Sequence, residues 1–175
     1  VIAIEEHYYD PEVVKHFDGR DGKLAGFLKK TLLDVGKARI DSMDEAGIDV
    51  QVLSHGAPST QKLAADIGPG IAAAANDRLY EICQTNPDRL AGFANLATAE
   101  PVSAADELER AVKQLGFKGA MIHGLTGGEL VIDDQRFWPI FERAEALDVP
   151  IYLHPGIPHE KVIEAYLGDY IEKYP

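Results

Sequence analysis

Short apolar runs alternate with longer segments of helical periodicity along the chain. In residues 103–116, SAADELERAVKQLG, apolar side chains recur every three or four positions, which predicts an amphipathic helix. Similar patterns predict helices over residues 36–48, 61–87 and 135–148. The apolar runs predict five strands, at residues 1–7, 49–55, 90–96, 119–124 and 150–155.

Several residues between these segments predict where helices start and end. Asp10 followed by Pro11 is typical of an N-cap and a first helical position, so a short helix is expected there. Ser103 is predicted to cap the helix that follows it, and Gly116 to end that helix. Residues 19–26, GRDGKLAG, are rich in glycine and predict a mobile loop or an active-site lid.

The alternation of strands and helices predicts parallel βαβ units, because parallel neighbours need a crossover connection between them. Strand spacings of roughly 30 to 45 residues suit such units. Five strands fit either a doubly wound sheet or part of a closed (β/α)8 barrel, which needs about 250 residues. A chain of 175 residues would hold only the first five units of such a barrel. We expect residues 1–175 to form a single domain.

Composition narrows the function classes. The net charge of −12 argues against a nucleic-acid surface, which needs clustered lysine and arginine. Cys83 is the only cysteine, so an internal disulfide is excluded, and a buried thiol in a reducing cytoplasm is expected. No apolar run approaches about 18 residues, which predicts no membrane-spanning helix. The first residues do not resemble a signal peptide. Since the chain starts without Met and ends at IEKYP with no stop pattern, we interpret it as a piece of a longer protein.

Titratable side chains gather where the predicted strands end. Functional groups of parallel sheets lie at the carboxyl ends of the strands, which share one edge. Four of the six histidines fall at these ends, although a lone strand-end histidine is more often a hydrogen-bonded rim residue than a ligand. The residues at the five strand ends are Glu5, Glu6, His7, Ser54, His55, Asn95, His123 and His154.

The types and spacing of these residues favour a metal site. Glu5 and His7 are two positions apart, so they point to the same face of the strand, whereas Glu6 points to the opposite face. Together with His154, this pair offers one carboxylate and two imidazoles, a set suited to Zn²⁺, Mn²⁺ or Mg²⁺. The remaining strand-end histidines, His55 and His123, are weaker ligand candidates, and contacts to a substrate are an equal alternative for them.

Five segments resemble one known family in their order and spacing: IAIEEHYYDPE, RIDSMDEAGIDVQVLS, PDRLAGFANLATAEPVSAADELERAV, LGFKGAMIHG and VPIYLHPGIP. Over residues 1 to 158 the chain resembles the amidohydrolase superfamily. The resemblance is nearest to its metal-dependent decarboxylase branch, which includes γ-resorcylate, dihydroxybenzoate, 5-carboxyvanillate and aminocarboxymuconate semialdehyde decarboxylases. It implies a (β/α)8 TIM barrel, of which this chain holds about the first five βα units, with one divalent metal ion.

The resemblance also implies roles for the strand-end residues. Glu5, His7 and His154 match the metal ligands of the family. The family's further histidine and aspartate follow strands six and eight, which lie outside this chain, so the site is expected to be incomplete here. Close relatives often carry Asn at the position of His123, so the orientation of the substrate is expected to differ. We expect catalytic roles for His154 and His123, and substrate contacts from His55, His123 and Asn95.

The function that the resemblance implies is non-oxidative decarboxylation of a hydroxyaromatic or related unsaturated carboxylic acid, with release of CO₂. One alternative is a metal-dependent hydrolase of a lactone or amide, which would release no CO₂. Another is a metal-free binding or scaffold barrel. The expected partner is a small carboxylic acid, and a homo-oligomer, either a dimer or a tetramer, is expected. Residues 136–144, RFWPIFERA, offer apolar surface for such pairing, with packing on the barrel as an equal alternative.

Overall fold

The structure is a computed structural model that describes residues 1–173. In that range five strands occur, and every strand pairing is parallel. They overlap the five predicted strands, although the third is shorter than the predicted residues 90–96. The strands are β1 (Ile2–Tyr8), β2 (Val50–His55), β3 (Leu90–Gly92), β4 (Ala120–His123) and β5 (Ile151–His154).

The strands lie side by side in chain order. One sheet contains β1, β2 and β3, and a second contains β4 and β5. An isolated parallel bridge between Ala94 and Ala120 links the segment after β3 to β4. The order does not reverse about β1, as it would in a doubly wound sheet. Of the two architectures that the sequence allowed, the structure therefore favours the barrel.

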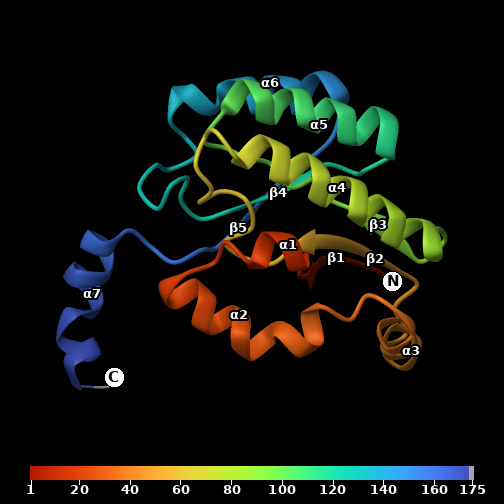
Figure 1. Cartoon of the computed structure of the whole chain (residues 1–175), viewed down its shortest axis with the longest axis horizontal. Coiled ribbons are helices and arrows are strands. Elements are labelled where there is room, and N and C mark those ends of the chain that lie inside the picture. The colour runs from red at the N-terminus through yellow and green to blue at the C-terminus, as the bar shows by residue number, and fades with distance from the viewer. Residues whose placement is uncertain (174–175) are drawn as a thin grey trace.

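Helices connect the strands and pack against them. Figure 1 shows α4, α5 and α6 together on one side of the strands, with α2 on the opposite side and α7 standing apart. Within residues 1–173, no helix combines the length and the apolar character needed to cross a membrane. The helices are α1 (Pro11–Val14), α2 (Gly19–Leu32), α3 (Lys37–Ala46), α4 (Gly68–Thr85), α5 (Pro101–Leu115), α6 (Trp138–Leu147) and α7 (Glu160–Lys173), with a 3-10 turn η1 (Gln135–Phe137) before α6.

Two apolar clusters show which way the side chains of each strand point. The larger cluster lies between strands and helices and includes Leu53 of β2 and Leu108 of α5, both fully buried. The smaller cluster joins Val52, Phe93 and Met121, which come from β2, the segment after β3, and β4. Leu53 and Val52 are neighbours in one strand, so alternate residues face the helices and the barrel interior. Residues an even number of positions from Val52 in β2, or from Met121 in β4, therefore point into the barrel.

The helix boundaries test the predicted caps. Asp10 caps α1 as predicted, since its carboxylate accepts hydrogen bonds from two backbone N–H groups of the first turn. Gly116 ends α5 as predicted, with a φ of 72° that favours glycine. The prediction for Ser103 is wrong, because α5 begins earlier, at Pro101. Proline suits that position because its fixed φ is helical and the N–H that it lacks would have no partner there.

Two predicted segments have different limits in the structure. Residues 19–26 were predicted as a loop but form the first half of α2, so that prediction is wrong. Three glycines cost helix stability there, but the intervening residues are helix formers such as Lys23. Helix α4 begins at Gly68 rather than near residue 61, with Pro69 in its first turn. Cys83 lies buried in α4, as predicted.

Candidate metal centre

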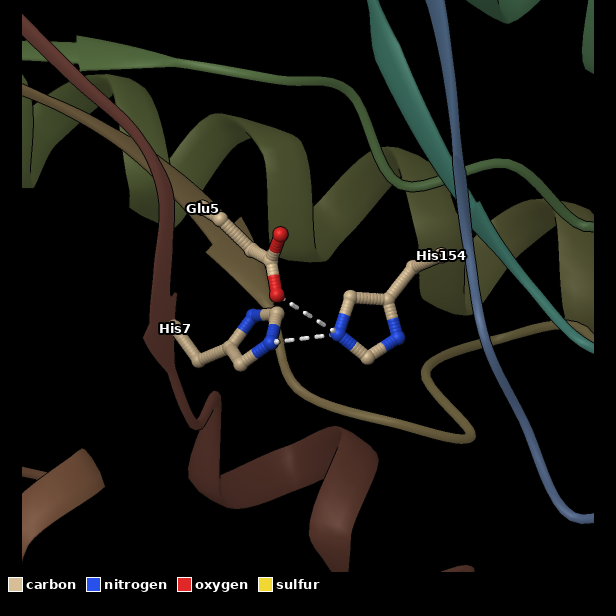
Figure 2. A group of neighbouring side chains, drawn as sticks. All are labelled: Glu5, His7 and His154. Atoms are coloured by element: carbon tan, nitrogen blue, oxygen red, sulfur yellow. Dashed lines mark hydrogen bonds and ion pairs between the residues drawn. The ribbon is translucent and has the colours of Figure 1, made fainter.

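Three donor groups converge where β1 and β5 end. Glu5 and His7 lie two residues apart in β1, and His154 is the last residue of β5. The distance between His7 Nε2 and His154 Nε2 is 3.2 Å, and the distance between His154 Nε2 and Glu5 Oε1 is 3.3 Å. One donor atom from each residue lies within 4.8 Å of the others. Figure 2 shows the three side chains pointing toward one another from the two strands.

These separations suit a single divalent cation. Two donors that are each about 2.1 Å from one ion lie about 3.0 Å apart at an octahedral angle and about 3.4 Å apart at a tetrahedral angle. The donor separations of 3.2 and 3.3 Å fall between those values. Two bare ring nitrogens at such a distance repel each other unless a proton or a cation lies between them. The three residues therefore fit a metal ion in both type and spacing.

Each imidazole is held through its other ring nitrogen. His154 Nδ1 is 2.6 Å from the carbonyl oxygen of Pro155, which can only accept, so Nδ1 carries a proton, and in the neutral ring Nε2 is the atom with the lone pair. His7 Nδ1 is 3.1 Å from the hydroxyl oxygen of Ser54, which can accept in the same way. Such partners are typical of metal-binding histidines, because they fix the tautomer and the ring orientation.

The surroundings favour the protonation states that a cation requires. Burial lowers the pKa of His7, and the neighbouring His154 lowers it further, so the His7 ring is neutral at neutral pH. The hydroxyl of Tyr152 donates a hydrogen bond to Glu5 and is the main cause of the lowered pKa of that carboxyl group. Metal ligands must be deprotonated, so a neutral imidazole and an ionised carboxylate are ready to bind.

The opposite face of β1 anchors the strand to a helix. Glu6 lies on that face, as predicted, and accepts a hydrogen bond of 3.0 Å from the Gln51 amide. Arg39 of α3 donates to Gln51 Oε1 at 3.1 Å and to the backbone carbonyl of His7 at 2.8 Å. This network holds the end of β1 against α3 and thereby fixes the backbone that carries His7.

His123 lies beside the two histidines of the donor set. Its ring centroid is 4.7 Å from that of His154 and 5.6 Å from that of His7. Its Nε2 is 2.7 Å from the carbonyl oxygen of His55, so Nε2 carries the proton and Nδ1 the lone pair. Nδ1 is buried and has no partner among the described residues. Burial lowers the pKa of His123 to about 3, so its ring is neutral.

His55 supports the site through its backbone. Its side chain is 2% exposed and packs against the rings of Tyr8, Tyr9 and Phe17. Its Nδ1 is 2.8 Å from the carbonyl oxygen of Gly56, and burial lowers its pKa to about 4. These contacts favour a packing role for the side chain, while the carbonyl of His55 orients His123. A contact between His55 and a substrate stays a prediction.

Asn95 belongs to a buried polar network. Its side-chain oxygen, Oδ1, accepts a hydrogen bond of 2.9 Å from the Ser59 hydroxyl group. Its amide nitrogen is 3.1 Å from Asn76 Oδ1 and 3.3 Å from the Tyr8 hydroxyl. Both the oxygen and the nitrogen of the side-chain amide have hydrogen-bond partners. These contacts favour a structural role for Asn95, in which it connects the segment after β3 to α4. A contact between Asn95 and a substrate also stays a prediction.

Two residues around the donor set were not predicted from the sequence, Tyr152 and Arg39. Tyr152 lies two positions before His154, so strand alternation places it on the same interior face. That signal was present in the sequence, and it is the one that paired Glu5 with His7. Arg39 lies on a helix whose position against β1 no local pattern reveals.

Comparison with known proteins identifies close relatives of the chain. The family model described as amidohydrolase matches residues 32–175. The γ-resorcylate decarboxylase of Rhodococcus jostii is 39% identical over 177 residues, which cover 95% of this chain and 54% of the relative. The decarboxylase orsB of Emericella nidulans is 35% identical, covering 97% of this chain and 51% of the relative. The chain thus spans about half the length of the curated relatives that it matches.

Solved structures show the same fold. The 5-carboxyvanillate decarboxylase of Novosphingobium aromaticivorans, complexed with manganese and 4-hydroxy-3-methoxy-5-nitrobenzoic acid, matches with a TM-score of 0.87 and 32% identity, covering 96% of this chain and 53% of that one. The dihydroxybenzoic acid decarboxylase of Polaromonas sp. JS666, with bound manganese and the inhibitor 2-nitroresorcinol, matches with a TM-score of 0.82 and 39% identity, covering 95% of this chain and 52% of that one. The predicted fold class, the first units of a (β/α)8 barrel, is confirmed.

Proposed function

We propose that the complete protein is a metal-dependent decarboxylase, because this chain belongs to the amidohydrolase family and is similar to decarboxylases of that family. Its substrate would be a hydroxylated aromatic acid, from which it would release CO₂ without an oxidant. The observation that carries the proposal is the convergence of Glu5, His7 and His154 on one point, in a chain that is similar to several decarboxylases.

The proposed metal ligands are Glu5 Oε1, His7 Nε2 and His154 Nε2. Mn²⁺ is the first ion to test, because two similar solved structures contain manganese. When bound, a divalent ion supplies positive charge that orients the oxygen atoms of an acidic substrate and stabilises the negative charge that develops as the carbon–carbon bond breaks. The chain's own contribution is to hold two imidazoles and one carboxylate close together.

We propose that His123 contacts the substrate next to this centre. With its Nε2–H donated to the carbonyl of His55, only Nδ1 remains, and Nδ1 can accept but not donate. It therefore suits a hydroxyl group of the substrate and not an ionised carboxylate. What supports this role is a buried Nδ1 that has no partner in the described part of the chain, on a ring that lies against His7 and His154.

The test is CO₂ release by the complete protein loaded with Mn²⁺. We expect CO₂ from a hydroxybenzoate such as 2,6-dihydroxybenzoate, and none from benzoate, which lacks the hydroxyl group. His154→Ala should lose bound Mn²⁺ and activity together, whereas His16→Ala, at an exposed histidine, should keep both. Hydrolysis of a lactone or amide without CO₂ release would replace this proposal with the hydrolase alternative. Full metal content in His154→Ala would remove His154 from the ligand set.

We also propose that the complete protein is a homo-oligomer. Trp138 at the start of α6 is 51% exposed, while Phe141, three residues later, packs against the core. The face of α6 that carries Trp138 therefore leaves apolar surface uncovered. Sedimentation of the complete protein tests the proposal, and a strict monomer would refute it.

A further inference from the structure

Glu5 has two chemically equivalent oxygens, and its side chain is exposed at one edge of the sheet. A free carboxylate of this kind rotates and offers either oxygen, or both, to a cation. In the structure the two oxygens have different partners. Oε1 is 3.3 Å from His154 Nε2, on the side of the donor set, while Oε2 accepts a hydrogen bond from the hydroxyl of Tyr152.

The ring of Tyr152 is partly buried inside the barrel. Tyr152 belongs to β5 and lies on the interior face with His154, two residues later. Its ring packs against the interior cluster of Val52, Phe93 and Met121. Because the hydroxyl group is attached to a planar ring, packing of the ring restricts where the hydroxyl can lie. The hydrogen bond therefore comes from a ring that is packed in the barrel and belongs to the same strand as His154.

The contact between Tyr152 and Glu5 also crosses the barrel interior. Glu5 lies in β1 and Tyr152 in β5, which belong to different sheets and do not pair with each other. The hydrogen bond joins residues 147 positions apart in the chain. It ties the carboxylate of Glu5 to β5, the strand that carries His154, so it links the positions of Glu5 and His154.

We propose that Tyr152 is a positioning residue that makes Glu5 a one-oxygen ligand, by occupying Oε2 and leaving Oε1 to the cation. This inference rests on the proposed function only in taking Glu5 as a metal ligand. It does not depend on which reaction follows. Partners that orient metal ligands in this way typically change metal affinity by about 10- to 100-fold when they are removed.

The decisive variant is Tyr152→Phe in the complete protein, which removes the hydroxyl and keeps the ring packing. We expect the dissociation constant for Mn²⁺, measured by competition with a chromophoric chelator, to rise about 10- to 100-fold. Tyr166→Phe makes the same chemical change at a residue that is 78% exposed, and it should leave the Mn²⁺ affinity unchanged. An unchanged affinity in Tyr152→Phe would overturn the inference.

A double-variant cycle separates positioning from general structure. If Tyr152 acts through Glu5, then Tyr152→Phe should have no further effect on Mn²⁺ affinity in a Glu5→Ala background. An equal loss in both backgrounds would show that Tyr152 acts by another route and would overturn the inference. CO₂ release is measured separately on the same proteins. A wild-type protein that binds Mn²⁺ but releases no CO₂ would refute the proposed reaction, while the expected cycle would still support the role of Tyr152.

Discussion

Replacing Asp10 by alanine should lower the free energy of unfolding substantially, because this carboxylate joins two helices directly after the metal-site strand. Asp10 is 2% exposed. Its Oδ1 accepts from the backbone N–H groups of Glu12 and Val13, at 2.9 and 3.1 Å, and so caps α1. Arg78 of α4 donates to the same carboxylate through two nitrogens, at 2.6 and 2.9 Å.

The expected magnitude follows from these contacts. Loss of an N-cap side chain costs about 1 kcal/mol. Hydrogen bonds to a charged group contribute about 1.5–3 kcal/mol, but the lower end applies here because Arg78 is 36% exposed and water can solvate the freed guanidinium. We therefore expect Asp10→Ala to destabilise the protein by about 2–3 kcal/mol at pH 7.

The effect should depend on pH in a defined direction. Burial alone would raise the pKa of Asp10, but the hydrogen bonds from Arg78 and from the first turn of α1 lower it overall. A group whose folded pKa is lowered stabilises the protein above its unfolded pKa, about 3.9 for aspartate. That contribution is lost as the pH falls through the folded pKa. The difference between wild type and Asp10→Ala should therefore shrink below about pH 4.

Urea unfolding of the complete protein at pH 7 and near pH 3 measures this difference. Asp41→Ala is a matched control, because Asp41 pairs with Lys37 on the exposed face of α3 and should cost less than about 0.5 kcal/mol. An Arg78→Met background should remove much of the penalty of Asp10→Ala. A cost below about 0.5 kcal/mol at pH 7, or an equal cost at both pH values, would refute the reasoning.

Three further predictions concern single sites. His123→Asn should keep the metal content and change KM or substrate preference. His123→Ala should lower kcat/KM by the equivalent of about 1–3 kcal/mol, because the substrate hydroxyl group that His123 contacts would be buried without a partner. Metal loss in His123→Asn would make His123 a ligand. Gly119→Ala should destabilise the protein in urea, because φ is +139° and the new Cβ would clash with the carbonyl oxygen of Pro150. Gly70→Ala, where the Cβ would enter open space, should be tolerated, and equal stability of the two variants would contradict this prediction. Burial raises the pKa of Cys83 to about 11, so this thiol should resist a thiol reagent at pH 8 until the protein unfolds; rapid labelling of the folded protein would argue against its burial.

The sequence alone located the strands of the described residues and the faces on which their side chains lie. The apolar runs and helical periodicity located all five strands, because period-2 and period-3.6 patterns are imposed by the backbone of each segment. The same local rule placed Glu5 with His7 on one face and Glu6 on the other. It also located His154 at a strand end, where parallel strands bring their carboxyl ends to one edge. The caps at Asp10 and Gly116 were predictable because each depends only on its own turn.

The sequence predicted the limits of helices less well where two local sequence preferences disagreed. Ser103 has the side chain of an N-cap, but Pro101 also suits the first turn, and the helix begins at the proline. Residues 19–26 carry three glycines, which indicate a loop, yet the surrounding residues form a helix. In both cases two local preferences of similar size disagree, and the sequence does not decide between them.

Only the tertiary structure decided which atoms are available for chemistry. The proton on His154 Nδ1 and the proton on His123 Nε2 follow from carbonyl groups that accept them, and the carbonyl for His123 belongs to His55, 68 residues away. The hydroxyl that orients Glu5 comes from Tyr152, 147 residues away. Strand alternation fixes the face on which a side chain lies, but a hydrogen bond needs a partner at a particular distance. The partner of His154 is the neighbouring residue Pro155, but the partners of His123 and Glu5 are supplied by packing between β1, β2, β4 and β5, which no single segment of the sequence encodes.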